Sequence, residues 1–236
     1  MQLELKRPFL VIVGSWNPAI FQPEWIGKHI FEFADGDQFP VGILQATHTQ
    51  VLDDQVVELQ LPPVVYHEQV GIACTTDRLE IYINEVSDEI LRRAEMAARK
   101  ILSTLSHTPV GSYGVNFQFS DSEPDSDVTD AIETKEELAR IKPILNRSFK
   151  NKFNFDDNCD LNLARNFNES GLELNFNFHH QNRGTENLIE QIPGIYKKYF
   201  ELMRVAFGAK YQIQELKDIQ KIGHDFGQKD DNGEEV

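Results

Sequence analysis

Two predicted strands and the helix that follows them restrict the fold of this chain more than any other segment. In residues 78–86, every second position from 79 to 83 is apolar, which predicts a strand with one buried face. Residues 69–75 predict a second strand, separated from the first by a short turn. The apolar positions of the later strand are Leu79, Ile81 and Ile83. The pair is an antiparallel hairpin whose apolar face requires a covering layer.

Residues 88–105 are expected to form the helix that covers this hairpin. Ser87 precedes the helix and is a favoured N-cap, because its side-chain oxygen can accept a hydrogen bond from a backbone N–H of the first turn. Asp88 and Glu89 suit the positive end of the helix dipole. One helical face is apolar and consists of Ile90, Ala94, Ala97, Ala98, Ile101 and Leu105.

A second hairpin and helix occur later in the chain. Residues 161–167 and 172–178 predict two strands, with Gly171 supplying a positive φ at the turn. A helix is expected from Thr185, its N-cap, to about residue 207, with a break at Pro193. Three of six positions are identical between residues 79–84 and 172–177. This likeness fits either an internal repeat or a chance match of two amphipathic hairpins.

The sequence therefore predicts an α+β fold of mostly antiparallel sheets, each covered by helices, in two similar hairpin–helix–strand halves. The expected parts are an N-terminal half at 1–120, an acidic loop at 121–135, a C-terminal half at 136–226 and a disordered tail at 227–236. Further strands are expected at 6–14, 41–46, 55–61, 113–119 and 211–216, and further helices at 21–33 and 136–149, the last followed by a Lys- and Asn-rich loop. Gly208 is expected to end the helix that begins at Thr185.

Composition sets the class of protein. The 236 residues are 40% hydrophobic and 26% charged, so the chain can bury a core without disulfides or metals. No apolar run approaches the roughly 20 residues that span a bilayer, so no membrane partner is expected. The two cysteines, Cys74 and Cys159, form no metal or redox motif. These features favour a reducing compartment and a cytoplasmic location.

The net charge of −15 argues against direct nucleic-acid binding, since a phosphate backbone would be repelled. Four basic residues do gather on the predicted helix 88–105. Because the other face of that helix is apolar, we interpret them as a solvated helix face. They are Arg92, Arg93, Arg99 and Lys100.

Three groups of residues have the chemistry of metal ligands. The first is the acidic group Asp121, Glu123, Asp125, Asp127 and Asp130, and the other two are the histidine-containing pairs His67-Glu68 and His179-His180. A calcium loop of the EF-hand type requires Gly and Glu at the sixth and twelfth positions, where this chain has Ser126 and Ile132. Neither histidine pair has a third ligand at zinc spacing. No metal or other cofactor is assigned.

No catalytic residue is assigned either. Ser15 follows a buried strand, but the second glycine of a nucleophile elbow is absent. Cys74 lies in an apolar strand, where a thiol is usually inert. Glycine loops that cradle phosphates do not occur. Alternating aromatic residues on two strands are interpreted as core, because their neighbours are Asn, Gln and acids rather than bases; they are Phe117, Phe119, Phe176 and Phe178.

These observations favour a non-enzymatic protein-binding subunit or adaptor of a larger assembly. The negative charge would steer it toward a basic protein partner, and exposed strand edges near residues 113–119 or the C-terminal segment would add strands to a partner or to a second copy. One alternative is an enzyme subunit, hydrolase or nuclease-like, whose acids meet only in the fold. Another is an acidic inhibitor that mimics nucleic acid.

Overall fold

The computed structural model describes residues 1–34, 42–44, 47–52, 55–60, 62–124, 146–156, 158–181, 184–216 and 221–222. Within them, ten strands pair antiparallel in one sheet. The order is β10-β11-β12-β9-β2-β8-β7-β6-β3, and β1 also pairs with β9. A short strand, β13, pairs parallel with β1, and β4 and β5 form a separate two-stranded sheet.

The strands are β1 (Gln2–Glu4), β2 (Leu10–Gly14), β3 (Gly42–Leu44), β4 (Thr47–Leu52), β5 (Gln55–Gln60), β6 (Val64–His67), β7 (Val70–Cys74), β8 (Arg78–Ile83), β9 (Val110–Asp121), β10 (Asn146–Asp156), β11 (Cys159–Asn168), β12 (Gly171–Gln181) and β13 (Lys221–Ile222). The helices are the 3-10 turn η1 (Pro18–Ile20), α1 (Pro23–His29), α2 (Asp88–Thr104), α4 (Thr185–Gln191) and α5 (Ile195–Tyr211). None of the described helices is long and apolar enough to cross a bilayer.

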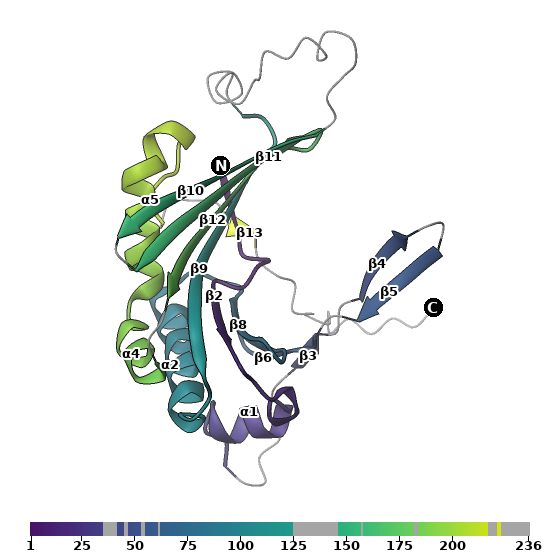
Figure 1. Cartoon of the computed structure of the whole chain (residues 1–236), viewed down its shortest axis with the longest axis vertical. Coiled ribbons are helices and arrows are strands. Elements are labelled where there is room, and N and C mark those ends of the chain that lie inside the picture. Colours follow the sequence, from purple (N-terminus) through teal and green to yellow (C-terminus); the bar gives the residue numbers. More distant parts are fainter. Residues whose placement is uncertain are drawn as a thin grey trace, which may run out of the picture.

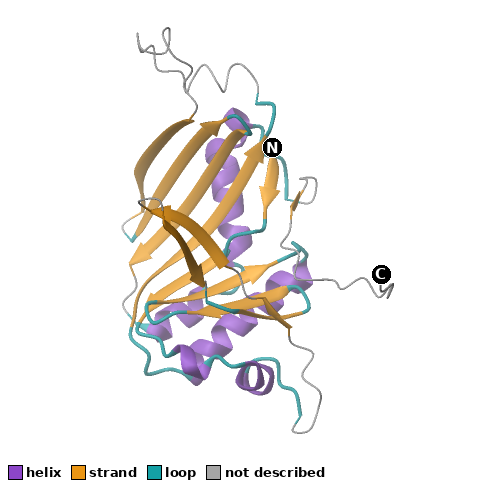
Figure 2. Cartoon of the chain, turned by 90° about the vertical axis from the view of Figure 1, so that its right-hand side faces the viewer, coloured by secondary structure: helices purple, strands orange, loops and turns teal. Residues whose placement is uncertain are grey.

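The molecule has two layers, and the sheet is strongly curved. Helices α2, α4 and α5 cover one face of the sheet, as Figure 1 shows. The other face carries no helix among the described residues, and Figure 2 looks onto it with the helices behind. We call this second surface the open face.

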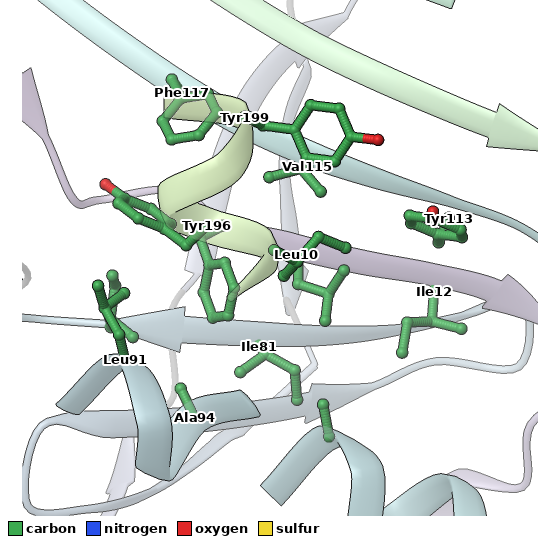
Figure 3. Packing of buried hydrophobic residues seen from close by; sticks show 14 of the residues in the cluster. Leu10, Ile12, Ile81, Leu91, Ala94, Tyr113, Val115, Phe117, Tyr196 and Tyr199 are labelled. Carbon is green, nitrogen blue, oxygen red and sulfur yellow. The ribbon is translucent and has the colours of Figure 1, made fainter. Parts of the chain in front are cut away.

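The core lies between the sheet and α2, α4 and α5. Phe117 of β9 packs edge-on against Tyr196 and Phe200 of α5, with ring centroids 5.0 and 5.8 Å apart. Leu91 and Ala94 bring α2 to the same interior, beside Ile81 of β8 (Figure 3). Each fully buried large apolar side chain stabilises the fold by roughly 1.5–3 kcal/mol relative to exposure. This layer confirms the predicted α+β class.

Strand β9 joins what the sequence divides into two halves. It pairs with β2 through residues 110–115 and with β12 through residues 112–121. Both predicted hairpins, β7–β8 and β11–β12, therefore belong to one sheet rather than to separate sheets, and the structure shows no internal repeat. The expectation of a free edge at residues 113–119 is wrong, because β9 is a central strand.

The structure tests the predicted ends of the helices. Ser87 accepts a hydrogen bond from the Ile90 N–H at 3.3 Å, which confirms the predicted N-cap of α2. The predicted break at Pro193 separates α4 from α5. The N-cap of α4 is Gly184 rather than Thr185, whose hydroxyl instead donates to the Thr108 carbonyl at 3.0 Å.

Four predictions in the second half of the chain are wrong. Helix α5 continues past Gly208 and ends at Tyr211, because Gln212 adopts the left-handed conformation and closes it. Tyr211 is therefore helical, and no strand forms over residues 211–216. Residues 146–149 belong to β10 and not to a helix, and the Lys- and Asn-rich segment after them continues that strand. The remainder of the predicted helix, at 136–145, and the tail at 227–236 lie outside the described residues.

Candidate functional site

The structure separates the residues that the sequence marked as metal ligands. His179 and His180 are neighbours on β12, so their side chains point to opposite faces of the sheet. His180 stacks on Tyr113 in the core, with ring centroids 4.5 Å apart. Two neighbouring strand residues of this kind cannot bind one ion together.

In the other pair, His67-Glu68, the histidine is part of an aromatic cluster. His67 is buried against Phe31 and Phe33, with ring centroids 4.9 and 5.0 Å away. Glu68 forms an ion pair with Arg93 of α2. In the acidic loop only Asp121 and Glu123 are described; Asp125, Asp127 and Asp130 fall outside. The described residues hold no group of three or more side chains able to bind a metal.

Ser15 and Cys74 are the two candidate nucleophiles. Ser15 is exposed in the turn after β2, and its backbone N–H donates to the Pro109 carbonyl at 3.0 Å. The Cys74 thiol donates to the Thr75 carbonyl at 3.3 Å. Burial, together with the nearby Glu80 carboxylate, raises the pKa of Cys74 to about 12, so it is not a nucleophile near neutral pH.

The basic cluster on α2 is partly paired with acids of the same chain. Arg93 contacts Glu68, and Lys100 contacts Glu32. Arg92 and Arg99 are exposed. Since half of the cluster is paired with carboxylates, the cluster is a weak candidate for binding an anion.

The open face instead carries a row of asparagines across three neighbouring strands. Asn162, Asn177 and Asn116 are direct cross-strand partners on β11, β12 and β9. Asn162 donates to Asn177 at 3.1 Å, and Asn177 donates to Asn116 at 2.7 Å. Asn116 donates in turn to the Pro8 carbonyl at 3.0 Å. Asn177 and Asn116 each both donate and accept, so the hydrogen bonds of the row all run in one direction.

A second polar row runs parallel to the first. The Ser148 hydroxyl donates to Asn166 at 2.7 Å, and Asn166 donates to the Glu173 carboxylate at 3.4 Å. Glu173 also accepts from Asn175 and lies 3.7 Å from the Arg7 guanidinium. Hydrogen bonds among its own side chains thus order this part of the open face.

Between these rows and β8 lies a pocket of about 250 Å³. Glu4 and Glu80 line it, together with the guanidinium groups of Arg7 and Arg78. Glu4 accepts from the Ser120 hydroxyl, and Glu80 accepts from the Tyr82 hydroxyl at 2.8 Å. Four amides also line it, from Asn116, Gln118, Asn175 and Asn177, and the rest of the lining is apolar. The Oε1 atom of Gln118 is buried without a hydrogen-bond partner among the described residues.

The open face ends at β10, which is the outermost strand on this side of the sheet. β10 is 11 residues long, and its one neighbour within the described part of the chain is β11. Most of its described side chains are exposed, including Phe153 at 41%. A long edge strand of this kind leaves a row of backbone N–H and C=O groups open to another strand.

The sequence carried only a weak signal for these features. Asparagine alternates with aromatic residues on both β9 and β12, which marks a polar face, but nothing in one strand indicates which other strand lies beside it. β10 was missed because its seven residues from Ser148 to Asn154 are mostly Lys, Asn and Ser, which have little strand preference.

No protein-family model, no curated protein and no solved structure matches this chain. The candidate functions therefore rest on the fold, the open face and the edge strand alone.

Proposed function

We propose that this chain is a non-enzymatic, protein-binding subunit that takes an extended segment of its partner as an added strand along β10. The observation that carries the proposal is the outer edge of that strand, which pairs with no other strand among the described residues. Strand addition supplies affinity through main-chain hydrogen bonds and specificity through alternate side chains. An edge of 11 residues is long enough for several such bonds.

The direction of the free backbone groups follows from the pairing of the sheet. The Asn116 N–H donates to the Phe9 carbonyl at 2.8 Å, so its backbone groups face β2 and not β12. In antiparallel sheets hydrogen-bonded and non-hydrogen-bonded pairs alternate across the strands. Asn116 and Asn177 are therefore a non-hydrogen-bonded pair, so the backbone groups of Asn177 face β11. Asn177 and Asn162 then form a hydrogen-bonded pair, so the backbone groups of Asn162 face β12. Asn162 and Lys152 are again a non-hydrogen-bonded pair, and the backbone groups of Lys152 face away from β11.

Alternation along β10 assigns the remaining positions. Ser148, Lys150 and Asn154 share the orientation of Lys152, so their N–H and C=O groups also face the free edge. The backbone groups of Asn151 and Phe153 are directed to β11 instead. A strand added at this edge would therefore bond to residues whose side chains lie on the open face.

The other side of the edge is apolar. Phe149 and Phe155 are half-buried and pack against the core, while Phe153 lies 6.1 Å from Phe207 of α5 between ring centroids. An added strand would extend this aromatic row and bury the exposed part of Phe153. The net charge of −15 would speed the encounter with a partner that is basic overall.

The test is to block the edge without breaking the sheet. Lys150→Pro removes one outward N–H and no ladder hydrogen bond, and proline is tolerated on edge strands. Lys150→Ala removes the same charge but keeps the N–H. Circular dichroism and thermal melting establish that both variants are folded.

Each protein is then used to capture partners from native-cell lysate for quantitative mass spectrometry. A partner retained in stoichiometric amount by the wild type and Lys150→Ala, but lost from Lys150→Pro, supports strand addition. A partner that all three retain equally, or the absence of any retained protein, overturns the proposal.

A second candidate function is hydrolysis, which the pocket on the open face favours because Glu4 and Glu80 both line it, together with two arginines. Paired carboxylates serve as acid and base in many hydrolases. The test is cleavage of labelled DNA and RNA oligonucleotides by the wild type and by Glu80→Gln, with added magnesium. Equal background rates for both proteins would exclude this reading for nucleic-acid substrates.

A further inference from the structure

We infer that the segment bound along β10 belongs to a different protein and carries acidic residues at alternate positions, with apolar residues between them. The inference rests on the proposed function, and it specifies the chemistry of the partner. It follows from the two lysines of the edge strand and from the registers that two copies of this strand could adopt.

The open-face side of the edge is cationic. Lys150 and Lys152 are two positions apart on β10, so both side chains lie on the open face, and both are exposed. Lys152 reaches Asp160 of β11 at 2.8 Å, while Lys150 has no carboxylate partner among the described residues. A strand beside β10 would place its own side chains opposite or diagonal to both lysines.

Pairing with a second copy is opposed by these lysines. In an antiparallel, two-fold pairing centred on Asn151, each Lys150 lies opposite the Lys152 of the other copy. Centred on Lys150 or on Lys152, that lysine lies opposite itself. Among the registers that keep the two faces aligned, these three pair the most backbone, and like charges directly opposite one another are destabilising.

A shift by one residue of register does not relieve this conflict. It would bring the phenylalanine side of one copy beside the lysine side of the other, because strand side chains alternate between faces. Lysines on an edge strand commonly prevent strands of the same kind from associating. The registers that pair the longest stretches of two copies are thus disfavoured, whereas a strand with the opposite charge meets no such repulsion.

A partner strand with alternating acidic and apolar residues is complementary to both the lysine side and the phenylalanine side of the β10 edge. Its carboxylates would meet Lys150 and Lys152, and its apolar residues would lie beside Phe149 and Phe153 on the helix side. Opposite charges directly across from one another stabilise the pairing of two strands. The overall negative charge of the chain does not prevent this contact, because salt screens charges more than about 10 Å away.

Two labelled peptides test the charge preference. One alternates Val and Glu, and the other alternates Val and Lys. We expect the wild type to bind the Val–Glu peptide severalfold more tightly, measured by fluorescence anisotropy, because two charge pairs that are attractive with this peptide become repulsive with the Val–Lys peptide. Lys150→Glu/Lys152→Glu should reverse the order, and Lys150→Pro should weaken both complexes.

Oligomeric state provides the second readout. The wild type should be monomeric by light scattering. The single variant Lys150→Glu becomes self-complementary in the register centred on Asn151, because the carboxylate introduced in each copy would face Lys152 of the other. It should therefore dimerise more strongly than either the wild type or the double variant.

Several outcomes would overturn the inference. Equal binding of the two peptides, or a wild-type dimer that Lys150→Pro dissociates, would show that the lysines do not select the partner. If neither peptide binds while capture of a partner still depends on the Lys150 N–H, the acidic strand is wrong and strand addition stands. If capture is also unaffected by Lys150→Pro, the proposed function itself falls.

Discussion

Glu95 of α2 accepts a hydrogen bond from the backbone N–H of Gly194 at 2.8 Å, where α5 begins. The Ile195 and Tyr196 N–H groups also act to lower the pKa of this carboxyl. A helix N-terminus leaves its first N–H groups without intrahelical partners, and Gly194 itself has no side chain to cap them. Glu95 therefore performs from another helix the task that Ser87 performs locally for α2.

Removing this carboxylate should destabilise the protein. Glu95→Ala leaves partly buried N–H groups without an acceptor, which costs about 1–3 kcal/mol. The free energy of unfolding, from urea denaturation followed by circular dichroism, measures the loss. Arg99→Ala, an exposed change on the same helix, should stay within about 0.5 kcal/mol of the wild type. A loss of unfolding free energy no larger than that of the control would show that the Glu95 contact does not stabilise the start of α5.

The same carboxyl predicts a pH dependence. Burial raises the pKa of Glu95 above its ordinary value of 4.5, against the opposing effect of the backbone N–H groups. A carboxyl whose pKa is higher in the folded state binds protons more tightly when folded, so its contribution to stability falls as the pH rises from 4.5 through the folded pKa. The wild type should therefore lose stability relative to Glu95→Gln as the pH increases from about 4 to about 7. An unchanged difference between the two proteins over this range would contradict the shift.

The sequence predicted the elements whose signals are local. Alternation identified β8 and β12, and the Ser87 cap placed the start of α2 within one residue. Pairing across the sheet was not predictable, because no residue of β9 indicates that β2 and β12 lie on its two sides. The two hairpins were therefore assigned to separate sheets.

The candidate site was less predictable than the fold. Its asparagine row depends on three strands that are far apart in sequence, at residues 116, 162 and 177. The residues of the edge strand β10 have little intrinsic preference for strands. The strand is stabilised by its pairing with β11, which intrinsic preference does not indicate. Tertiary pairing overrode local preference at both places.

The asparagine row should be coupled energetically to Gly114. A Cβ at position 114 would lie 2.7 Å from the Asn177 Nδ2 atom, so Gly114→Ala should displace that amide and break its two hydrogen bonds. We expect a loss of about 1–2 kcal/mol. In the Asn177→Ala background the obstruction is gone, so the same change should cost at least about 0.5 kcal/mol less.

Gly111 offers the matched control for this cycle. A Cβ there would meet no atom within 4 Å, so Gly111→Ala should be neutral or slightly stabilising, since glycine weakens a strand. Urea denaturation of the four proteins of the cycle gives the coupling. Strictly additive effects would show that Asn177 does not rest over Gly114.

The turn of the β11–β12 hairpin should not tolerate a side chain. Gly171 has a φ of 112°, and a Cβ there would lie 2.1 Å from the Asp121 carbonyl oxygen. Because backbone strain adds to a contact with backbone atoms, Gly171→Ala should cost more than the roughly 1–3 kcal/mol of strain alone. Gly184→Ala isolates the strain, since Gly184 also has a positive φ but no atom within 4 Å of its Cβ position. Equal losses of unfolding free energy in the two variants would mean that the β9 end near Asp121 moves aside without cost.

The buried thiol of Cys74 should react only when the protein opens. With a pKa raised to about 12 by burial and then by the Glu80 carboxylate, about one thiol in ten thousand is ionised at pH 8. Iodoacetamide should therefore label Cys74 far more slowly in the native protein than in urea, as mass spectrometry of its peptide would show. Glu80→Gln removes the second cause and should speed native labelling modestly, whereas Glu89→Gln, at an exposed position on α2, should not. Rapid native labelling of the wild type would instead show that β7 exposes this thiol, and that the sheet opens on the side of β6 and β3 more often than its buried residues imply.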